Sequence, residues 1–145
     1  GNFDSEVAQA LTEGGQGGLE IYQLAARHQV TPGTTNLGTV RAISAETGRT
    51  EWLFETRAGT MSLVATGGGL VFGGDANGRF RAFDHRTGEI LWEINIGSSV
   101  SGYPITFEVD GTQYIAVNTG GGQVNLTPEL RPSRGTNLYV FALPN

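Results

Sequence analysis

One 15-residue pattern occurs twice in the chain, and this repeat constrains the fold more than any other feature. The first copy, GTVRAISAETGRTEW, begins at residue 38, and the second, GRFRAFDHRTGEILW, begins at residue 78, a constant offset of 40 residues. The matched pairs are Gly38 and Gly78, Arg41 and Arg81, Ala42 and Ala82, Thr47 and Thr87, Gly48 and Gly88, and Trp52 and Trp92. A fixed period of this size is typical of repeat architectures.

Each copy is predicted to form a β-hairpin. Alternating residues such as Val40 and Ala42 indicate a short strand, and the Thr-Gly pair marks the turn before a second run that ends in Trp. The small Ala and the large Trp are expected at opposite ends of the hairpin. An indole from one hairpin would therefore stack over the Ala and Gly of its neighbour, where a bulkier side chain would block it. The pattern predicts a contact between neighbouring sheets.

From residue 38 onward the chain continues as short alternating runs separated by turn residues. The predicted strands cover residues 38–44, 50–56, 61–66, 70–74, 78–84, 90–96, 105–109, 113–118 and 138–144. Asp110-Gly111 between two alternating runs is a strong signal for a two-residue hairpin. Antiparallel strands in up-and-down order, four per repeat of about 40 residues, predict an all-β fold made of β-propeller blades.

This strand order predicts only part of a propeller. One complete blade covers residues 61–96, an outer half-blade precedes it, and most of another blade follows it. So few blades cannot close a ring and would leave open sheet edges. We therefore expect the propeller to be completed by another chain or by a missing segment of a longer protein.

Residues 1–37 lack the repeat and are predicted to form a long excursion between strands, whereas residues 38–145 form the last blades of a single propeller domain. A short helix is expected from Asp4 or Ser5 as N-cap, ended by the glycine pairs that follow. Residues 19–30 fit either a strand or a helix.

The up-and-down order predicts two unlike ends for the blades. The short turns at 46–48, 67–69, 86–88 and 110–111 fall on one side, and the irregular segments 1–37, 57–61 and 119–136 fall on the other. Because loops on a rigid scaffold usually carry binding sites, the side with the long segments is the candidate functional face. The alternative is that long loops are merely tolerated there.

Composition and charge argue against several kinds of site. The formal net charge of −5 argues against nucleic acid or an anionic membrane surface as a partner, and no run is long enough to span a membrane. The absence of cysteine excludes a disulfide and a thiolate metal site. His28 and His85 have no partner at metal-ligand spacing. Arg41 and Arg81 alternate with apolar residues and are predicted on the polar side of half-buried strands.

The repeat follows the pattern Ala-x-Asp-x-x-x-Gly-x-x-x-Trp. Ala82, Asp84, Gly88 and Trp92 meet it in full, and the first copy meets it except that Ser44 replaces the Asp. A longer block, ATGGGLVFGGDANGRFRAFDHRTGEILW, is followed by GYPITFEVDGTQYIAV and a closing LYVFALP. The stretch from residue 38 to the end therefore resembles the C-terminal part of the pyrroloquinoline quinone (PQQ)-dependent alcohol dehydrogenases, quinoproteins whose blades carry tryptophan-docking motifs.

This resemblance implies an eight-bladed propeller in the periplasm that oxidises an alcohol to an aldehyde or ketone. It implies PQQ with Ca²⁺ or a lanthanide on the propeller axis, and an Asp that takes the alcohol proton while hydride passes to the quinone. The metal ligands and the catalytic Asp are expected outside this chain. The expected partners are the remainder of the propeller, the alcohol, and a periplasmic electron acceptor such as a cytochrome c.

The resemblance also implies two site segments in this chain. A cofactor contact is expected at the start of an inner strand, where many relatives have a Trp that touches PQQ; the residues there are Thr60, Met61 and Ser62. The substrate entrance is expected at the glycine-containing end of another strand; the residues there are Asn118, Thr119, Gly120 and Gly121. Both segments are predicted on the functional face, where they would wall a shared pocket.

A second hypothesis belongs to another class of protein. The same repeat also builds non-catalytic propeller scaffolds, akin to outer-membrane assembly factors, in which the long-loop face would bind protein. Adjacent cysteines and an Asp-x-Asp-like segment elsewhere in the polypeptide would favour the enzyme over the scaffold.

Overall fold

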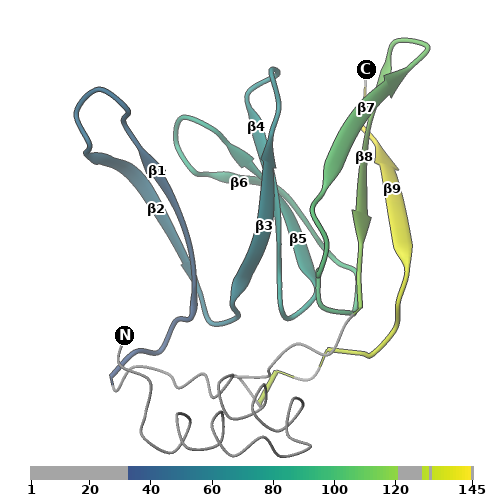
Figure 1. Cartoon of the computed structure of the whole chain (residues 1–145), viewed down its shortest axis with the longest axis horizontal. Helices are drawn as coiled ribbons and strands as arrows, with labels where there is room; N and C mark the ends of the chain where they lie inside the picture. The colour runs from purple at the N-terminus through teal and green to yellow at the C-terminus, as the bar shows by residue number, and fades with distance from the viewer. Residues whose placement is uncertain (1–32, 121–128, 131, 145) are drawn as a thin grey trace, which may run out of the picture. The chain divides into compact units, whose positions relative to one another are not determined.

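The structure is a computed structural model that describes residues 33–120, 129–130 and 132–144, all of them within the unit Pro32–Asn145. These residues form nine strands and no helix (Figure 1). The strands are β1 (Gly38–Ile43), β2 (Thr50–Thr56), β3 (Thr60–Ala65), β4 (Leu70–Asp75), β5 (Arg79–Asp84), β6 (Ile90–Asn95), β7 (Ile105–Val109), β8 (Thr112–Asn118) and β9 (Leu138–Ala142). The helix expected from Asp4 or Ser5, and the ambiguous stretch 19–30, lie outside the described residues.

The strands form three antiparallel sheets, in the orders β1-β2, β3-β4-β5-β6 and β7-β8-β9. Every predicted strand is confirmed within two residues at each end. The predicted arrangement of a half blade, a complete blade and most of a third matches the two, four and three strands of these sheets.

The hairpin between β7 and β8 shows how local chemistry sets the register. Asp110 and Gly111 both have positive φ, 51° and 76°, and Val109 pairs directly with Thr112 across them. Two consecutive residues with positive φ match the twist of antiparallel strands, and Asp-Gly is a preferred pair for such turns. The two-residue turn expected from the sequence is therefore confirmed.

The two ends of the sheets differ, as the strand order requires. In Figure 1 the hairpin turns β1–β2, β3–β4, β5–β6 and β7–β8 lie at one end, and the connections β2–β3, β4–β5 and β6–β7 lie at the other. We call the second end the connection side. It carries both of the segments that the sequence analysis associated with a site.

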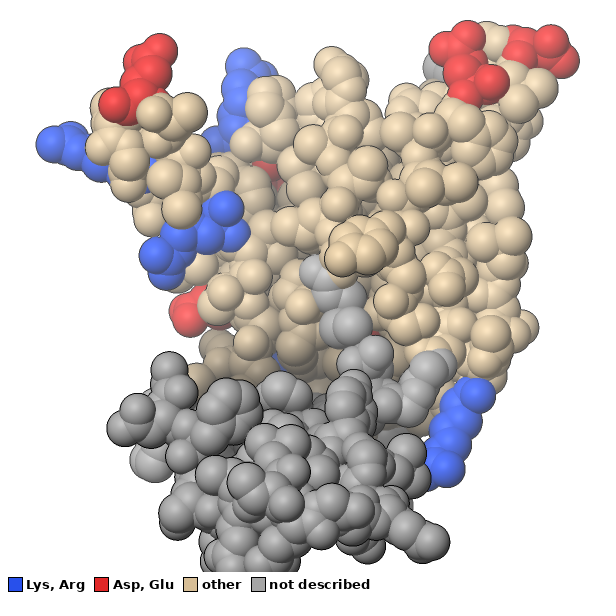
Figure 2. Space-filling view, in the orientation of Figure 1, with Lys and Arg blue, Asp and Glu red and all other residues tan. Residues whose placement is uncertain are grey.

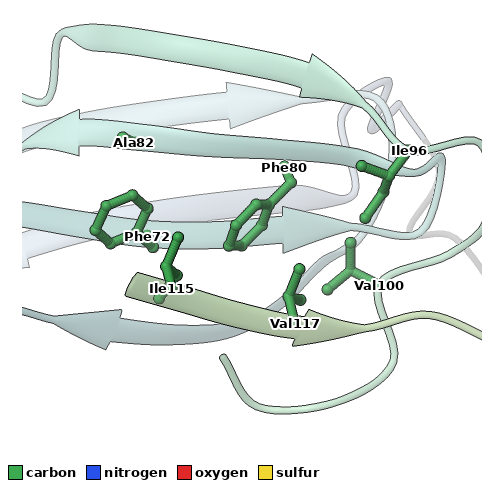
Figure 3. Packing of buried hydrophobic residues seen from close by; sticks show 7 residues of the cluster. All are labelled: Phe72, Phe80, Ala82, Ile96, Val100, Ile115 and Val117. Carbon is green, nitrogen blue, oxygen red and sulfur yellow. The ribbon is translucent and has the colours of Figure 1, made fainter. Parts of the chain in front are cut away.

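The main core lies between the four-stranded and the three-stranded sheets. Strand alternation directs every second side chain of β5 and β9 to the facing surfaces, and Phe80 of β5 stacks on Phe141 of β9 with their ring centroids 6.1 Å apart. The buried members of this cluster are Phe72, Phe80, Ala82, Ile96, Val100, Ile115 and Val117 (Figure 3). This packing holds the connection between β6 and β7 against the sheets, because Ile96 and Val100 come from that connection.

The first repeat Trp joins the two-stranded sheet to the four-stranded sheet. The Trp52 indole Nε1–H donates to the carbonyl oxygen of His85 at 2.9 Å, and the ring lies over Gly88. A Cβ at Gly88 would come within 2.6 Å of the indole. The second repeat Trp, Trp92, meets Phe141 edge to face at 5.2 Å but remains 37% exposed. The expectation that Ala and Trp lie at opposite ends of each hairpin was wrong, because Ala82 pairs directly with Trp92 and the first hairpin has the same register.

A buried ion pair lies on the opposite face of the four-stranded sheet. Arg81 is only 8% exposed; it donates to Asp75 at 2.7 Å and to Glu93 at 2.6 Å. Its guanidinium lies 5.3 Å from the centre of the Phe54 ring on β2. The prediction of a half-buried polar strand face was therefore incomplete for Arg81, because the neighbouring sheet covers it.

The outer face of the three-stranded sheet is apolar and uncovered in the described part of the chain. Its exposed large side chains are Ile105, Phe107, Val109, Leu138 and Val140. Figure 2 shows mostly uncharged atoms over β7 to β9, with acidic atoms gathered near the β7–β8 turn. A contiguous apolar surface of this kind is typical of an interface.

Candidate functional site on the connection side

Thr60 is the first residue of β3 and pairs with Asp75, the last residue of β4. Its side chain packs beside Gly38 at the start of β1. The Thr60 hydroxyl oxygen is buried and has no hydrogen-bond partner among the described residues. A buried hydroxyl without a partner is costly, so this atom has unused capacity to donate to a bound group.

Ser62, two residues further along β3, is already engaged. Its hydroxyl donates to the carbonyl oxygen of Gly102 at 2.5 Å. Gly102 belongs to the connection that leads into β7, so this bond joins β3 to the connection before the next sheet. Between Thr60 and Ser62, Met61 lies within β3, and its side chain is outside the description.

Asn118 approaches the same glycine from the other side. It is the last residue of β8, and its side-chain amide lies directly against the Cα of Gly102, where a Cβ would have no room. The backbone N–H of Ser101 donates to the Asn118 carbonyl oxygen at 3.4 Å. The structure thus brings Ser62 and Asn118, one from each predicted segment, into contact with one residue, Gly102.

Thr119 and Gly120 hold the backbone beyond β8. The backbone N–H of Thr119 donates to the carbonyl oxygen of Asn137 at 2.9 Å, and the Thr119 hydroxyl oxygen accepts from the Asn137 N–H at 3.2 Å. The N–H of Gly120 donates to the Ser99 carbonyl oxygen at 3.0 Å. These contacts define a neck that closes the base of the segment between β8 and β9. Gly121 lies outside the described residues.

Arg57, in the connection from β2 to β3, makes a contact that no sequence pattern indicated. Its Nε donates to Glu129 at 2.6 Å, and its Nη1 donates to the Thr35 carbonyl oxygen at 2.7 Å. The backbone N–H of Glu129 lowers the pKa of the Glu129 carboxyl from 4.5; partial burial opposes this shift, and the hydrogen bond and charge of Arg57 add to it. Arg57 and Glu129 lie 72 residues apart in the sequence, and only the fold brings them together.

The site residues supply hydrogen-bonding groups and a fixed wall. Hydroxyls come from Thr60 and Ser62, and an amide comes from Asn118. In the described part of the chain, no group of three or more His, Cys, Asp or Glu residues lies close enough together to hold a metal ion. These residues can therefore position a ligand but do not by themselves provide acid–base or metal chemistry.

Residues 57–115 match the family described as PQQ glucose/ethanol/alcohol dehydrogenase, β-propeller domain. A solved quinohemoprotein alcohol dehydrogenase from Comamonas testosteroni is 33% identical with a TM-score of 0.62, over 72% of this chain and 16% of that one. A europium-containing methanol dehydrogenase is 31% identical with a TM-score of 0.67, over 77% and 24%. The antiparallel sheets are blades of a β-propeller, and the predicted fold class is confirmed.

The curated relatives carry the family likeness further. A quinoprotein ethanol dehydrogenase from Pseudomonas putida is 40% identical over 117 residues, which are 75% of this chain and 19% of that protein. The resemblance to quinoprotein alcohol dehydrogenases is thereby confirmed. The chain spans about a fifth of the length of the relatives it matches. Within the described residues, no helix is long and apolar enough to cross a membrane.

Proposed function

We propose that this chain is part of a PQQ-dependent dehydrogenase that oxidises an alcohol to an aldehyde or ketone. The observation that carries the proposal is the 40% identity to a quinoprotein ethanol dehydrogenase over 117 residues, far more than the repeat alone. In this proposal the chain supplies the closing blades of the propeller and part of the cofactor and substrate wall. The reacting acid–base group and the metal ligands come from the rest of the protein.

The residues at the start of β3 fit a PQQ contact. The Thr60 hydroxyl, buried and unpartnered among the described residues, is the observation that supports the fit, because PQQ offers carbonyl and carboxylate oxygens to a donor. When bound, PQQ accepts the hydride of the alcohol. Thr60, Met61 and Ser62 would hold one side of the cofactor, and Ca²⁺ or a lanthanide would bind to ligands outside this chain.

The end of β8 would border the route by which the alcohol enters. Asn118 would present its amide there, while Thr119 and Gly120 hold the backbone in place and Gly121 continues the segment. The contact of Asn118 with Gly102, the residue that Ser62 also binds, supports a common wall for cofactor and substrate.

Three further features belong to the same proposal. The Trp52 contact with Gly88 would be one tryptophan-docking contact of a series around an eight-bladed ring. The enzyme would work in the periplasm. It would pass electrons to an acceptor such as a cytochrome c, and its similarity to a cytochrome c-linked methanol dehydrogenase of Methylorubrum extorquens supports this.

The proposal is tested on the whole polypeptide that carries this segment. The purified protein is reconstituted with PQQ and Ca²⁺, or with PQQ and a lanthanide, and ethanol oxidation is followed with an artificial electron acceptor. Quinone absorbance that stays with the protein, together with turnover of ethanol, is the expected result. A protein that retains no quinone under either condition would favour the non-catalytic scaffold.

A further inference from the structure

Asp75 is the last residue of β4 and lies directly opposite Thr60, and both of its carboxylate oxygens accept hydrogen bonds. The residue is 1% exposed. Oδ1 accepts the backbone N–H groups of Asn77 at 2.9 Å and Arg79 at 3.0 Å, and Oδ2 accepts from Arg81 at 2.7 Å. One carboxylate therefore holds both the turn that follows β4 and a buried cation, which leaves it no freedom to rotate.

The turn held by Asp75 joins two other connections through its backbone. The N–H of Ala76 donates to the Gly59 carbonyl oxygen at 2.9 Å, and Gly59 is the residue before Thr60. On the other side, the Ser99 hydroxyl donates to the Ala76 carbonyl oxygen at 2.5 Å. The turn thus lies between the start of β3 and the connection from β6 to β7.

The second of these connections leads to the proposed substrate wall. The N–H of Val100 donates to the Asp75 carbonyl oxygen at 3.2 Å, and Val100 forms a bridge with Thr119. The N–H of Gly120 donates to Ser99, as described above. A continuous series of backbone bonds therefore runs from Asp75 to Gly59 in one direction and to Thr119 in the other.

We propose that Asp75 is a positioning residue for the proposed PQQ and alcohol site. Asp75 touches neither ligand. It fixes the turn that sets the distance between the start of β3, at Thr60, and the end of β8, at Asn118. The inference rests on the proposed function for its ligand, but the series of bonds that carries it belongs to the fold alone.

The negative charge of Asp75 is necessary for this role, because both of its oxygens face donors. An Asn at this position would direct its amide NH₂ either at Arg81 or at the backbone N–H groups of the turn, and one side would lose its acceptor. Arg81 cannot relax away easily, since Glu93 and the Phe54 ring hold it from other directions. The variant Asp75→Asn should therefore loosen the turn while keeping the size of the side chain.

Glu93 offers a matched control. It meets the same guanidinium at 2.6 Å through a carboxylate and also accepts from the Arg79 side chain at 3.3 Å, but it lies on the outer strand β6 and, among the described residues, accepts none of the backbone N–H groups of the turn that Asp75 holds. Glu93→Gln removes the same kind of charged hydrogen bond from Arg81 as Asp75→Asn does. If weakening the ion pairs of Arg81 were enough to reduce PQQ or alcohol binding, both variants would show the reduction. A positioning effect would appear only in Asp75→Asn.

The test measures PQQ binding, alcohol kinetics and backbone protection in the whole protein. The PQQ dissociation constant is titrated by quinone absorbance with Ca²⁺ present, the KM is measured for ethanol, and hydrogen exchange is followed at the amides of Ala76, Val100 and Gly120. For Asp75→Asn we expect the dissociation constant or the KM to rise about 10- to 100-fold, the range for a small misplacement of site groups. Faster exchange at the three amides should accompany this rise. For Glu93→Gln we expect neither change.

The possible results separate failure of this inference from failure of the proposed function. Equal binding, kinetics and exchange in Asp75→Asn and the wild type, or equal losses in the two variants, would overturn the positioning role. If the wild type binds no PQQ, the proposed function fails, and the exchange rates alone then decide whether Asp75 sets the turn.

A second variant covers the case in which Asp75→Asn does not fold. Arg81→Lys keeps the positive charge but loses the forked donor that reaches Asp75 and Glu93 together. We expect a smaller rise in the PQQ dissociation constant, in the same direction and with faster exchange at Ala76. An unchanged constant and unchanged exchange would overturn the proposal.

Discussion

At the scale of single residues, Asp84 in the turn between β5 and β6 is held by backbone donors. It accepts the N–H groups of Thr87 at 2.9 Å and Arg86 at 2.8 Å. These bonds, that of Thr87 first, lower the pKa of the Asp84 carboxyl from 3.8. The unfolded chain therefore takes up this proton at a higher pH than the folded protein, so the stabilising effect is complete above pH 3.8 and is lost as the pH falls through the lower folded value.

Asp84→Asn should remove this dependence on pH. The amide keeps an oxygen that accepts from the turn but does not titrate in this range. We expect the melting temperature of the variant to fall less than that of the wild type as the pH is lowered below 3.8. Ser44 holds the equivalent turn of the first repeat through its hydroxyl, so Ser44→Ala should leave the pH dependence as in the wild type. Parallel pH curves for Asp84→Asn and the wild type would contradict the assignment.

Thr60 and Arg86 allow the two ends of the blades to be compared at the residue scale. Thr60→Trp should raise the PQQ dissociation constant or the KM for the alcohol, because a large side chain would enter the proposed wall. Arg86→Trp, in an exposed turn at the other end, should change neither quantity. Both are measured by quinone titration and steady-state kinetics on the whole protein. Equal effects of the two substitutions would count against the connection side as the functional face.

The close packing of Thr60 beside Gly38 requires a milder variant as control. Thr60→Val has nearly the same shape and removes only the unpartnered hydroxyl. Without PQQ it should be as stable as the wild type or more stable, because a buried group without a partner costs about 1–3 kcal/mol. If the hydroxyl serves PQQ, the same variant should bind PQQ less tightly. Thermal unfolding of Thr60→Val and of the wild type, each with and without PQQ, distinguishes a loss of folding stability from a loss of PQQ binding.

At the scale of elements, two matched glycines isolate the contact between sheets. Gly48 and Gly88 occupy equivalent turn positions with φ of 69° and 73°, but only Gly88 lies under the Trp52 indole. In the described part of the chain, a Cβ at Gly48 would meet no atom within 4 Å. Replacement by Ala therefore adds the same backbone strain at both positions and a steric clash at one of them.

Gly88→Ala should consequently cost more stability than Gly48→Ala. The left-handed backbone alone costs about 1–2 kcal/mol for an L-residue, and the forced shift of the indole adds about 1–3 kcal/mol at Gly88. Chemical unfolding of the whole protein measures both. Equal losses would mean that the indole moves aside freely and that its contact with the next sheet contributes little.

The elements could be predicted because their signals are local. Alternation marks the strands, and Asp110-Gly111 has side chains that suit a turn with positive φ, so the pattern and the backbone agree. The core face of β5 follows from the same alternation. No such signal exists for the contacts between connections.

The contacts of the candidate site are the part that sequence reasoning missed. Ser62 meets Gly102 across 40 residues, and Arg57 meets Glu129 across 72 residues. The separation of the first pair equals the 40-residue period of the repeat, but nothing in the repeat indicates that these two residues touch, and the separation of the second pair does not recur. The resemblance directed attention to Thr60 and Asn118, but only the fold shows that Gly102 lies between Ser62 and Asn118.

At the scale of the whole molecule, the uncovered apolar face of the three-stranded sheet determines how this segment behaves alone. Leu138 is 71% exposed and Ile105 59% exposed on that face, and the outer edge of β9 has no partner strand in the described residues. Open edges and apolar patches promote association between chains.

Expressed alone, residues 1–145 should therefore aggregate or fold poorly. Light scattering and size-exclusion chromatography measure association, and denaturant unfolding measures cooperativity. The whole polypeptide, in which we expect further blades to cover this face, serves as the control and should remain monodisperse. A segment that is monodisperse and unfolds cooperatively would show that its three sheets need no further blades.

The neck formed by Thr119 and Asn137 also has a consequence for protein engineering. Because the Thr119 N–H donates to the Asn137 carbonyl oxygen and the Thr119 hydroxyl accepts from the Asn137 N–H, β8 and β9 should keep their register when the length of chain between them changes. Doubling the length of a flexible loop costs only about 0.6 kcal/mol in closure entropy. An insert between Thr119 and Asn137 should therefore leave the pairing of β8 with β9 unchanged, so that the blade itself would need no redesign.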